Sequence, residues 1–161
     1  MIYSKYTFFY SSRNPFSNWH MVSFKEGSTV YNCSEQYMMA EKAKLFNDEE
    51  TREKILVASH PRDQKDLGRK VKNFDKVKWE ANARKIMYRG CYLKFTQNDK
   101  ILKTLFETKG TLLVEASKDD IIWGVGLSED NPLINDPNNW KGTNWLGETL
   151  TKLRDDLFKH E

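Results

Sequence analysis

The sequence lacks several features by which a function is most easily recognised. It contains only two cysteines, Cys33 and Cys91, and no CxxC motif, so it indicates neither a zinc site nor a disulfide framework. Reduced thiols are expected. Its three histidines, His20, His60 and His160, do not have the spacing of metal ligands, and a Gly-x-Ser-x-Gly nucleophile motif is absent. A metal centre and a histidine-based catalytic triad are therefore not expected.

Long hydrophobic runs and a strong charge of one sign are absent as well. No apolar stretch approaches the roughly 20 residues that a membrane-spanning helix requires. The N-terminal stretch MIYSKYTFFY is too short and too polar for a signal peptide, so we expect a cytoplasmic protein without a membrane partner. The net charge of +3 permits an anionic substrate but does not by itself indicate nucleic-acid binding.

The composition that is present is that of a globular domain. The chain has 161 residues, of which 39% are hydrophobic and 13% aromatic. A chain of this length is typical of one domain that buries about 70% of its unfolded surface. There is no internal repeat, low-complexity tract or linker, so residues 1–161 are expected to form a single compact domain.

Aromatic and β-branched residues predict short strands in two parts of the chain. The first part holds residues 7–11, 21–25 and 28–32, with a polar loop at 14–20. The second part holds residues 111–117 and 121–127, which we interpret as a hairpin-like pair.

Helical spacing and capping residues predict five helices between and after these strands. Their expected N-terminal residues are Ser34, Asn47 with Glu50, Asp75, Asn98, and Thr143 or Asn144. The dipeptide His60-Pro61 is expected to end the second helix. This order of elements is typical of an α+β fold that is predominantly helical, with a small β component.

The first of these helices, residues 34–46, contains an unusual pair. Glu35 and Lys42 are seven residues apart, which is two helical turns, so they share one face. The neighbouring Met38 and Met39 could be partly buried. This part of the helix is therefore either a solvated edge or an active site.

Polar residues interrupt apolar surroundings again near the expected hairpin. Even spacing places Leu113, Glu115 and Ser117 on one strand face, so Glu115 must be paired or have a shifted pKa if that face is covered. A structural salt bridge or a solvated face is the alternative. Asp119 and Asp120 directly precede the second strand, where a turn is the alternative to a catalytic carboxylate.

Glycines and tryptophans lie close together in the last third of the chain. Gly124 and Gly126 form a lone GxG, which is weak as a phosphate motif but lets the backbone approach a flat ligand beside Trp123. Trp123 is the best candidate among the five tryptophans for a stacking platform. Gly142 precedes a helix whose free N–H groups could receive a phosphate, with a structural turn as the alternative.

Six blocks of sequence resemble, in order, those of the NADAR family, also called YbiA-like. They are NPFSNW, SEQYMMAEKA, LGRKVKNFDKVKW, MYRGCYLKFTQN, LLVEASKDDIIWGVGL and WKGTNWLGETL, and the resemblance covers roughly residues 8–158. It implies a compact, mostly helical α+β domain with N-glycosidase activity. The substrates that it implies are ribosylated aminopyrimidine phosphates of riboflavin biosynthesis, or ADP-ribose attached to guanine, which can be part of a nucleic acid.

The residue patterns and the resemblance together predict a site. The residues expected to be catalytic are Glu35, Lys42 and Asp120. Those expected to bind substrate are Trp79, Glu115, Trp123, Gly124, Gly142 and Asn144, together with an N-terminal turn formed by Arg13, Asn14, Ser17 and Asn18.

Two chemical routes would use such residues. An N-glycoside breaks as positive charge develops at the anomeric carbon, so a nearby carboxylate can stabilise that charge or activate water. A desolvated lysine offers a second route, in which Lys42 attacks a ring-opened sugar to form a Schiff base and Glu35 shuttles a proton. Neither route needs a metal or a cofactor. The alternative function is a non-catalytic module that binds ADP-ribose or a nucleotide, which would not need Glu35, Lys42 and Asp120 together.

Overall fold

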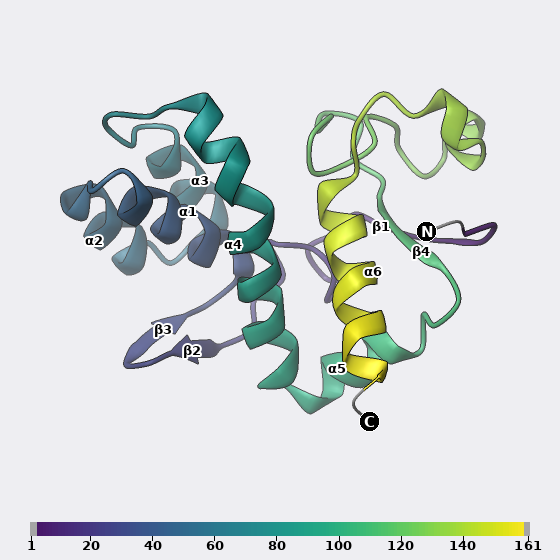
Figure 1. Cartoon of the computed structure of the whole chain (residues 1–161), viewed down its shortest axis with the longest axis horizontal. Coiled ribbons are helices and arrows are strands. Elements are labelled where there is room, and N and C mark those ends of the chain that lie inside the picture. The colour runs from purple at the N-terminus through teal and green to yellow at the C-terminus, as the bar shows by residue number, and fades with distance from the viewer. Residues whose placement is uncertain (1–2, 160–161) are drawn as a thin grey trace. The chain divides into compact units, whose positions relative to one another are not determined.

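The computed structural model describes residues 3–159 of the chain and divides it into two compact units. One unit is the continuous stretch Asn18–Asn98, which we call the continuous unit. The other combines Met1–Ser17 with Asp99–Glu161, which we call the discontinuous unit. The described residues form six α-helices and four short strands, which confirms the predicted, mainly helical α+β fold (Figure 1). The single domain over residues 1–161 remains a prediction.

The continuous unit is built around a nearly buried helix. Helix α1 (Ser34–Leu45) is in contact with α2 (Glu49–Val57), α3 (Pro61–Gly68) and α4 (Lys76–Thr96), as Figure 1 shows. A small antiparallel hairpin of β2 (Phe24–Glu26) and β3 (Thr29–Tyr31) completes the unit. Most α1 side chains are buried, because the other helices and the hairpin surround it.

The start of α1 differs from the sequence prediction. Cys33 is the N-cap residue and makes no side-chain capping bond, whereas Ser34 is the first helical residue. The hydroxyl of Ser34 instead donates to Oδ1 of Asn18 over 2.9 Å, and the N–H of Glu35 donates to the carbonyl of Asn18 over 3.0 Å. The predicted cap is therefore wrong, because a residue distant in sequence satisfies the first turn.

The next three helices begin at residues whose polar side chains accept from the first helical N–H groups. Asp48, and not the predicted Asn47, begins α2 and accepts a bond from the N–H of Thr51. His60 was expected to end α2, but α2 ends at Val57 and His60 begins α3, a helix that the sequence analysis missed. Asp75 begins α4 as predicted.

The discontinuous unit is centred on a parallel strand pair. Strand β1 (Tyr6–Phe9) pairs with β4 (Leu112–Glu115), and helices α5 (Asp99–Phe106) and α6 (Trp145–Phe158) belong to the same unit. Two short 3-10 helices, η1 (Pro132–Asn135) and η2 (Pro137–Asn139), precede α6. The buried hydrophobic cluster of this unit comprises Val114, Ala116, Val125, Leu127 and Ile134.

The predicted second strand of a hairpin, residues 121–127, is wrong. This segment forms a series of turns, and β4 pairs with the distant β1 instead. The carboxylate of Asp120 accepts from the N–H groups of Ile122 and Trp123, which bends the chain immediately after β4. Because the carbonyl of Asp120 also accepts from Gly126, the segment is closed into a compact loop.

The second edge of β4 is held by side chains of α6 rather than by a strand. Asn144, the N-cap of α6, accepts from the N–H of Glu115 and donates to the carbonyl of Leu113, both over 3.0 Å. About two turns further along α6, the hydroxyl of Thr151 accepts from the N–H of Leu113. Gly147 lies at this contact, where a Cβ atom would collide with the carbonyl of Leu113. The start of α6 is thus fixed to the sheet.

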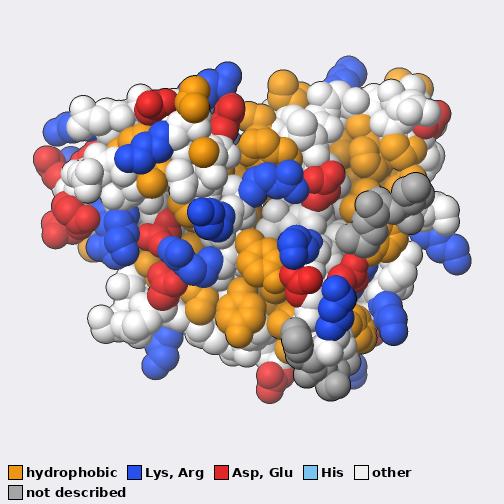
Figure 2. All heavy atoms as spheres, viewed as in Figure 1, with side chains coloured by type: hydrophobic (Ala, Val, Ile, Leu, Met, Phe, Trp, Pro, Cys, Tyr) orange, Lys and Arg blue, Asp and Glu red, His pale blue; other side chains and the backbone are white. Residues whose placement is uncertain are grey.

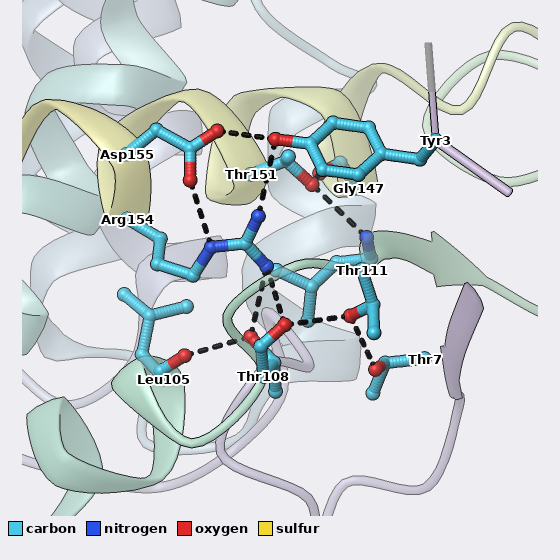
Figure 3. A network of polar contacts seen from close by, with 10 residues as sticks. Tyr3, Thr7, Leu105, Thr108, Thr111, Gly147, Thr151, Arg154 and Asp155 are labelled. Atoms are coloured by element: carbon cyan, nitrogen blue, oxygen red, sulfur yellow. Dashed lines mark hydrogen bonds and ion pairs between the residues drawn. The ribbon is translucent and has the colours of Figure 1, made fainter. Parts of the chain in front are cut away.

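A buried arginine ties the N-terminal segment to the end of α6 (Figure 3). The side chain of Arg154 is fully buried and donates to the carbonyl and hydroxyl oxygens of Thr108 over 2.9 and 3.1 Å. It also contacts Asp155 and the hydroxyl of Tyr3, and Tyr3 donates to Asp155. Each nitrogen of the Arg154 guanidinium has an acceptor in this network, so we interpret it as a structural support.

The surface mixes both signs of charge. Figure 2 shows acidic and basic side chains interspersed on the face that it displays, in keeping with the net charge of +3. Within the part of the chain that the structure describes, no helix combines the length and hydrophobicity of a membrane span.

Candidate functional site

The acid and the amine that the sequence predicts to be catalytic, Glu35 and Lys42, both lie on α1. Glu35 is 5% exposed, which excludes a solvated position for its side chain, and Lys42 is half-buried. Burial lowers the pKa of Lys42, the charge of Arg69 lowers it further, and the carboxylate of Glu35 acts in the opposite direction. The structure therefore brings the acid and the amine within electrostatic reach, as their spacing predicts.

Two aromatic rings flank the Lys42 amine. Its Nζ atom lies 4.7 Å from the centroid of the Phe74 ring and 5.5 Å from that of Trp79. Trp79 was predicted to contact substrate, whereas Phe74 was not singled out. Aromatic faces attract an ammonium group, so these rings form the immediate surroundings of the amine.

The predicted N-terminal turn crosses from one unit to the other. Arg13 is exposed, and Asn14 folds back so that its side-chain oxygen accepts from the N–H of Phe16 over 2.9 Å. Ser17 is buried in the discontinuous unit, and Asn18 is buried in the continuous unit, where it holds the start of α1. Asn18 thus has a clear structural role directly beside Glu35.

A groove of about 690 Å³ lies within the discontinuous unit. Among the predicted substrate-binding residues, it contains Asn14. Its other lining residues are Phe8, Phe9, Tyr10, Ser11, Ala116, Lys118, Ser128, Glu129 and Asp130.

Asp120 and Trp123, which follow β4, both make contacts that have a structural role. Asp120 binds the N–H groups of Ile122 and Trp123 over 2.9 and 2.8 Å, which is the turn that was weighed as its alternative role. Trp123 is half-buried, and the ring of Trp145 meets it edge-on at 5.6 Å and 84°. A catalytic role for Asp120 and a stacking role for Trp123 remain predictions.

The expectation of free amides before α6 is wrong. The N–H groups of residues 142–146 all donate to backbone carbonyls of residues 121–125. Gly142 is required there because a Cβ atom would collide with the carbonyl of Gly124. Asn144 is 2% exposed, and its amide is used by β4. These groups close a loop, and a role of Gly142 and Asn144 in binding substrate remains a prediction.

Glu115 ends β4 and is half-buried, between the buried positions Val114 and Ala116. The fixed position of its backbone follows from the bond to Asn144. Its role in binding substrate remains a prediction.

Sequence reasoning missed a partly buried charged cluster around Glu41 of α1. Glu41 is buried and forms an ion pair with Arg89, which also contacts Glu26 at 3.1 Å. The Tyr37 hydroxyl lies among them, accepts from Arg89 at 2.5 Å, and has a raised pKa because it is buried. The only local signal was the spacing of Tyr37 and Glu41, one turn apart, since their partners are distant in sequence.

A second missed residue is a lysine in the core. Lys94 on α4 is 1% exposed, and burial lowers its pKa to about 8, while the nearby thiols of Cys91 and Cys33 act against this shift. Burial raises the pKa of each thiol to about 11. Lys94 follows Cys91 by three residues, on the apolar face of α4, and this spacing could have identified it.

The described residues include no group of three or more His, Cys, Asp or Glu side chains placed to hold a metal ion.

Comparisons with known proteins assign these features to a family. The model of the NADAR domain matches residues 8–158. The chain is 39% identical to N-glycosidase R617 of Acanthamoeba polyphaga mimivirus, covering 94% of this chain and 96% of that protein. It is 37% identical to Protein irg-1 of Caenorhabditis elegans, covering 97% of this chain and 81% of that protein.

A solved structure shows the same fold. The NMR structure of the Escherichia coli protein YbiA superposes with a TM-score of 0.80 at 28% identity, covering 99% of this chain and 89% of that one. The family model, the relatives and the structure agree with the resemblance carried by the six sequence blocks. The chain belongs to the NADAR domain family.

Proposed function

We propose that this protein is an N-glycosidase, a hydrolase that cleaves the bond between a ribose and the nitrogen of a base or amine. The observation that carries the proposal is the Lys42 amine, whose pKa is lowered by burial next to the buried carboxylate of Glu35. The family relationship supports it, because several relatives are named N-glycosidase. A protein that only binds its ligand does not need a buried acid near a half-buried amine with a lowered pKa.

The favoured route uses Lys42 as a nucleophile. Its neutral amine adds to the anomeric carbon of the ring-opened riboside, the bond from that carbon to the base nitrogen breaks, and the base leaves with a proton. In this route Glu35 carries that proton. Water then hydrolyses the resulting imine, which releases the sugar aldehyde and restores the amine. The net reaction consumes one water molecule.

A second route needs only the carboxylate. In it, Glu35 stabilises the positive charge that develops at the anomeric carbon, or it activates a water molecule for attack. Lys42 would then bind and orient the substrate as a cation. The two routes differ in whether a covalent bond forms to Lys42.

The proposed substrate is a phosphorylated N-riboside. Ribosylaminopyrimidine phosphates of riboflavin biosynthesis and ADP-ribose attached to guanine are the two candidates. The first is supported by a relative named Riboflavin biosynthesis protein PYRR of Zea mays, which is 29% identical over 77% of this chain, although the match covers only 19% of that protein. A cytoplasmic site of action fits the two free cysteines.

Incubation of each candidate substrate with the protein, followed by chromatography, tests the proposal. Release of the free sugar is expected, and it should persist in EDTA. Lys42→Ala should lower kcat about 100-fold or more, the scale of losing a covalent or acid–base group. The matched control is Lys44→Ala, an exposed lysine of the same helix, which should retain full activity.

Borohydride then separates the two routes. A reduced sugar adduct on Lys42 during turnover supports the Schiff base, whereas activity lost in Glu35→Gln without any adduct favours the carboxylate. If the protein binds ADP-ribose but releases no product from either substrate, the binding-module alternative replaces the enzyme.

A further inference from the structure

An exposed aromatic ring lies where the proposed reaction would occur. Phe74 is 47% exposed, yet its ring is held 5.5 Å from the ring of Phe46 and 4.7 Å from Nζ of Lys42. Trp79 approaches the same Nζ atom at 5.5 Å. The amine thus has one ring from the α3–α4 loop and one from the first turn of α4 as neighbours.

The loop that carries Phe74 is anchored at several points. Val71 is buried, and the N–H of Lys72 donates to Oδ2 of Asp48 over 2.9 Å. Asn73 adopts the left-handed conformation, with φ of 60°, which reverses the chain directly before Phe74. These contacts, together with the packing against Phe46, hold the Phe74 ring beside the amine.

Two aromatic rings beside an amine can interact either with the amine itself or with a flat ligand. They attract the charged ammonium through their faces. They also offer the kind of surface on which a nucleobase stacks, an interaction of about 1–3 kcal/mol per base. The leaving group of an N-riboside is such a base, and its nitrogen must come close to the reacting amine.

We propose that Phe74, together with Trp79, binds the flat heteroaromatic base of the substrate, and that the bound base displaces the Lys42 amine from these rings toward the sugar. This inference rests on the proposed function, because it takes Lys42 as the reacting group. It restricts the substrate class to ribosides of aromatic bases. Ribosides of simple aliphatic amines are expected to be poor substrates.

Chemical labelling of Lys42 tests this without requiring turnover. Acetic anhydride is applied to the whole protein, and the modified fraction of Lys42 is measured by mass spectrometry after digestion. Guanosine monophosphate is the probe that carries a base, and ribose phosphate is the matched probe without one. We expect guanosine monophosphate to reduce labelling of Lys42 at least about fivefold, and ribose phosphate at the same concentration to protect it much less.

Substitutions of Phe74 then test whether its ring is responsible for the protection of Lys42. Phe74→Leu should weaken the affinity for guanosine monophosphate about tenfold, as expected for the loss of one stacked ring, and Phe74→Tyr should stay within about twofold. The control is Tyr92→Leu, which removes a ring of similar exposure, 44%, from α4 and should leave affinity and labelling unchanged. Circular dichroism confirms that each variant is folded.

The outcomes separate this inference from the proposed function. Wild-type affinity and protection in a folded Phe74→Leu variant would overturn the role of Phe74, even if the protein hydrolyses N-ribosides. Phe74-dependent protection by guanosine monophosphate in a protein that releases no sugar would support the base-binding role and leave the enzyme proposal refuted.

Discussion

The amine of Lys42 is influenced by three neighbours whose effects differ in sign. Burial removes water from the ammonium and lowers its pKa, and the guanidinium of Arg69 repels it and lowers the pKa further. The carboxylate of Glu35 attracts the ammonium and raises the pKa. Because the first effect is the largest, the neutral amine is more abundant near pH 7 than it would be in a lysine at the surface.

These signs give a prediction for two single variants. Glu35→Gln removes the raising effect, so the pKa of Lys42 should fall. Arg69→Gln removes a lowering effect, so the pKa should rise. The rate of Lys42 acetylation as a function of pH measures both, and the exposed Lys44 serves as a reference in the same digest. Shifts in the same direction in both variants would contradict the electrostatic assignment.

A second prediction concerns Lys94 and stability. Its folded pKa of about 8 lies below that of the unfolded chain, so between these values the unfolded state binds more protons and the folded state gains stability as the pH rises. Wild type should therefore gain about 1 kcal/mol relative to Lys94→Met between pH 7 and pH 9.

Urea unfolding of both proteins at several pH values measures this difference. The titration of Cys33 and Cys91, which opposes the gain above pH 9, is common to both proteins and cancels to first order. A constant difference across this pH range would show that Lys94 is not titrated in the folded protein near pH 8.

At the level of elements, local signals were reliable where a helix start depends on residues close in sequence. Asp75 begins α4 as predicted because its carboxylate accepts from two N–H groups in the first turn of that helix, those of Val77 and Lys78. The strand predicted for residues 121–127 was wrong because the conformation of this segment depends on residues that are distant in sequence. The apolar composition of the segment is typical of a strand, but its backbone is bonded to the distant residues 141–146, a pairing that no local pattern indicates.

The attachment of α6 to β4 leads to a prediction at this scale. Asn144→Ala removes two hydrogen bonds, a buried one to Leu113 and a partly buried one to Glu115, and is expected to cost about 2–4 kcal/mol of unfolding free energy. Asn144→Gly relieves the strain of a φ of 54° but lacks the same bonds. If the hydrogen bonds dominate, the glycine variant recovers only a small part of the loss in urea unfolding. Full recovery in the glycine variant would assign the effect to the backbone instead.

At the scale of the whole molecule, some features could be predicted from the sequence, whereas contacts between distant residues could not. The family, the fold class and the Glu35–Lys42 pair could all be inferred from sequence blocks and helical spacing. The parallel pairing of β1 with β4 and the ion pair of Glu41 with Arg89 could not, because each joins residues far apart in sequence. The place of Phe74 beside Lys42 depends on the turn at Asn73 and was missed for the same reason.

The division into two units predicts how a fragment should behave. Residues Asn18–Asn98 are continuous and include four packed helices, so this fragment should fold alone and unfold cooperatively with a helical circular dichroism spectrum. The complementary piece, Asp99–Glu161, lacks β1, so β4 has no strand partner and the piece should be largely unfolded. A disordered Asn18–Asn98 fragment would show that this part depends on the remainder of the chain.

The parallel β1–β4 pair also has a consequence for biosynthesis. A ribosome that adds about 5–20 residues per second completes Asn98 a few seconds before it reaches the start of α6. During that interval the nascent chain can bury the helices of the continuous unit, while Tyr6–Phe9 must wait for Leu112–Glu115 to emerge. Synthesis thus imposes an order on assembly in which Tyr6–Phe9, although made before the continuous unit, is secured only after that unit is complete.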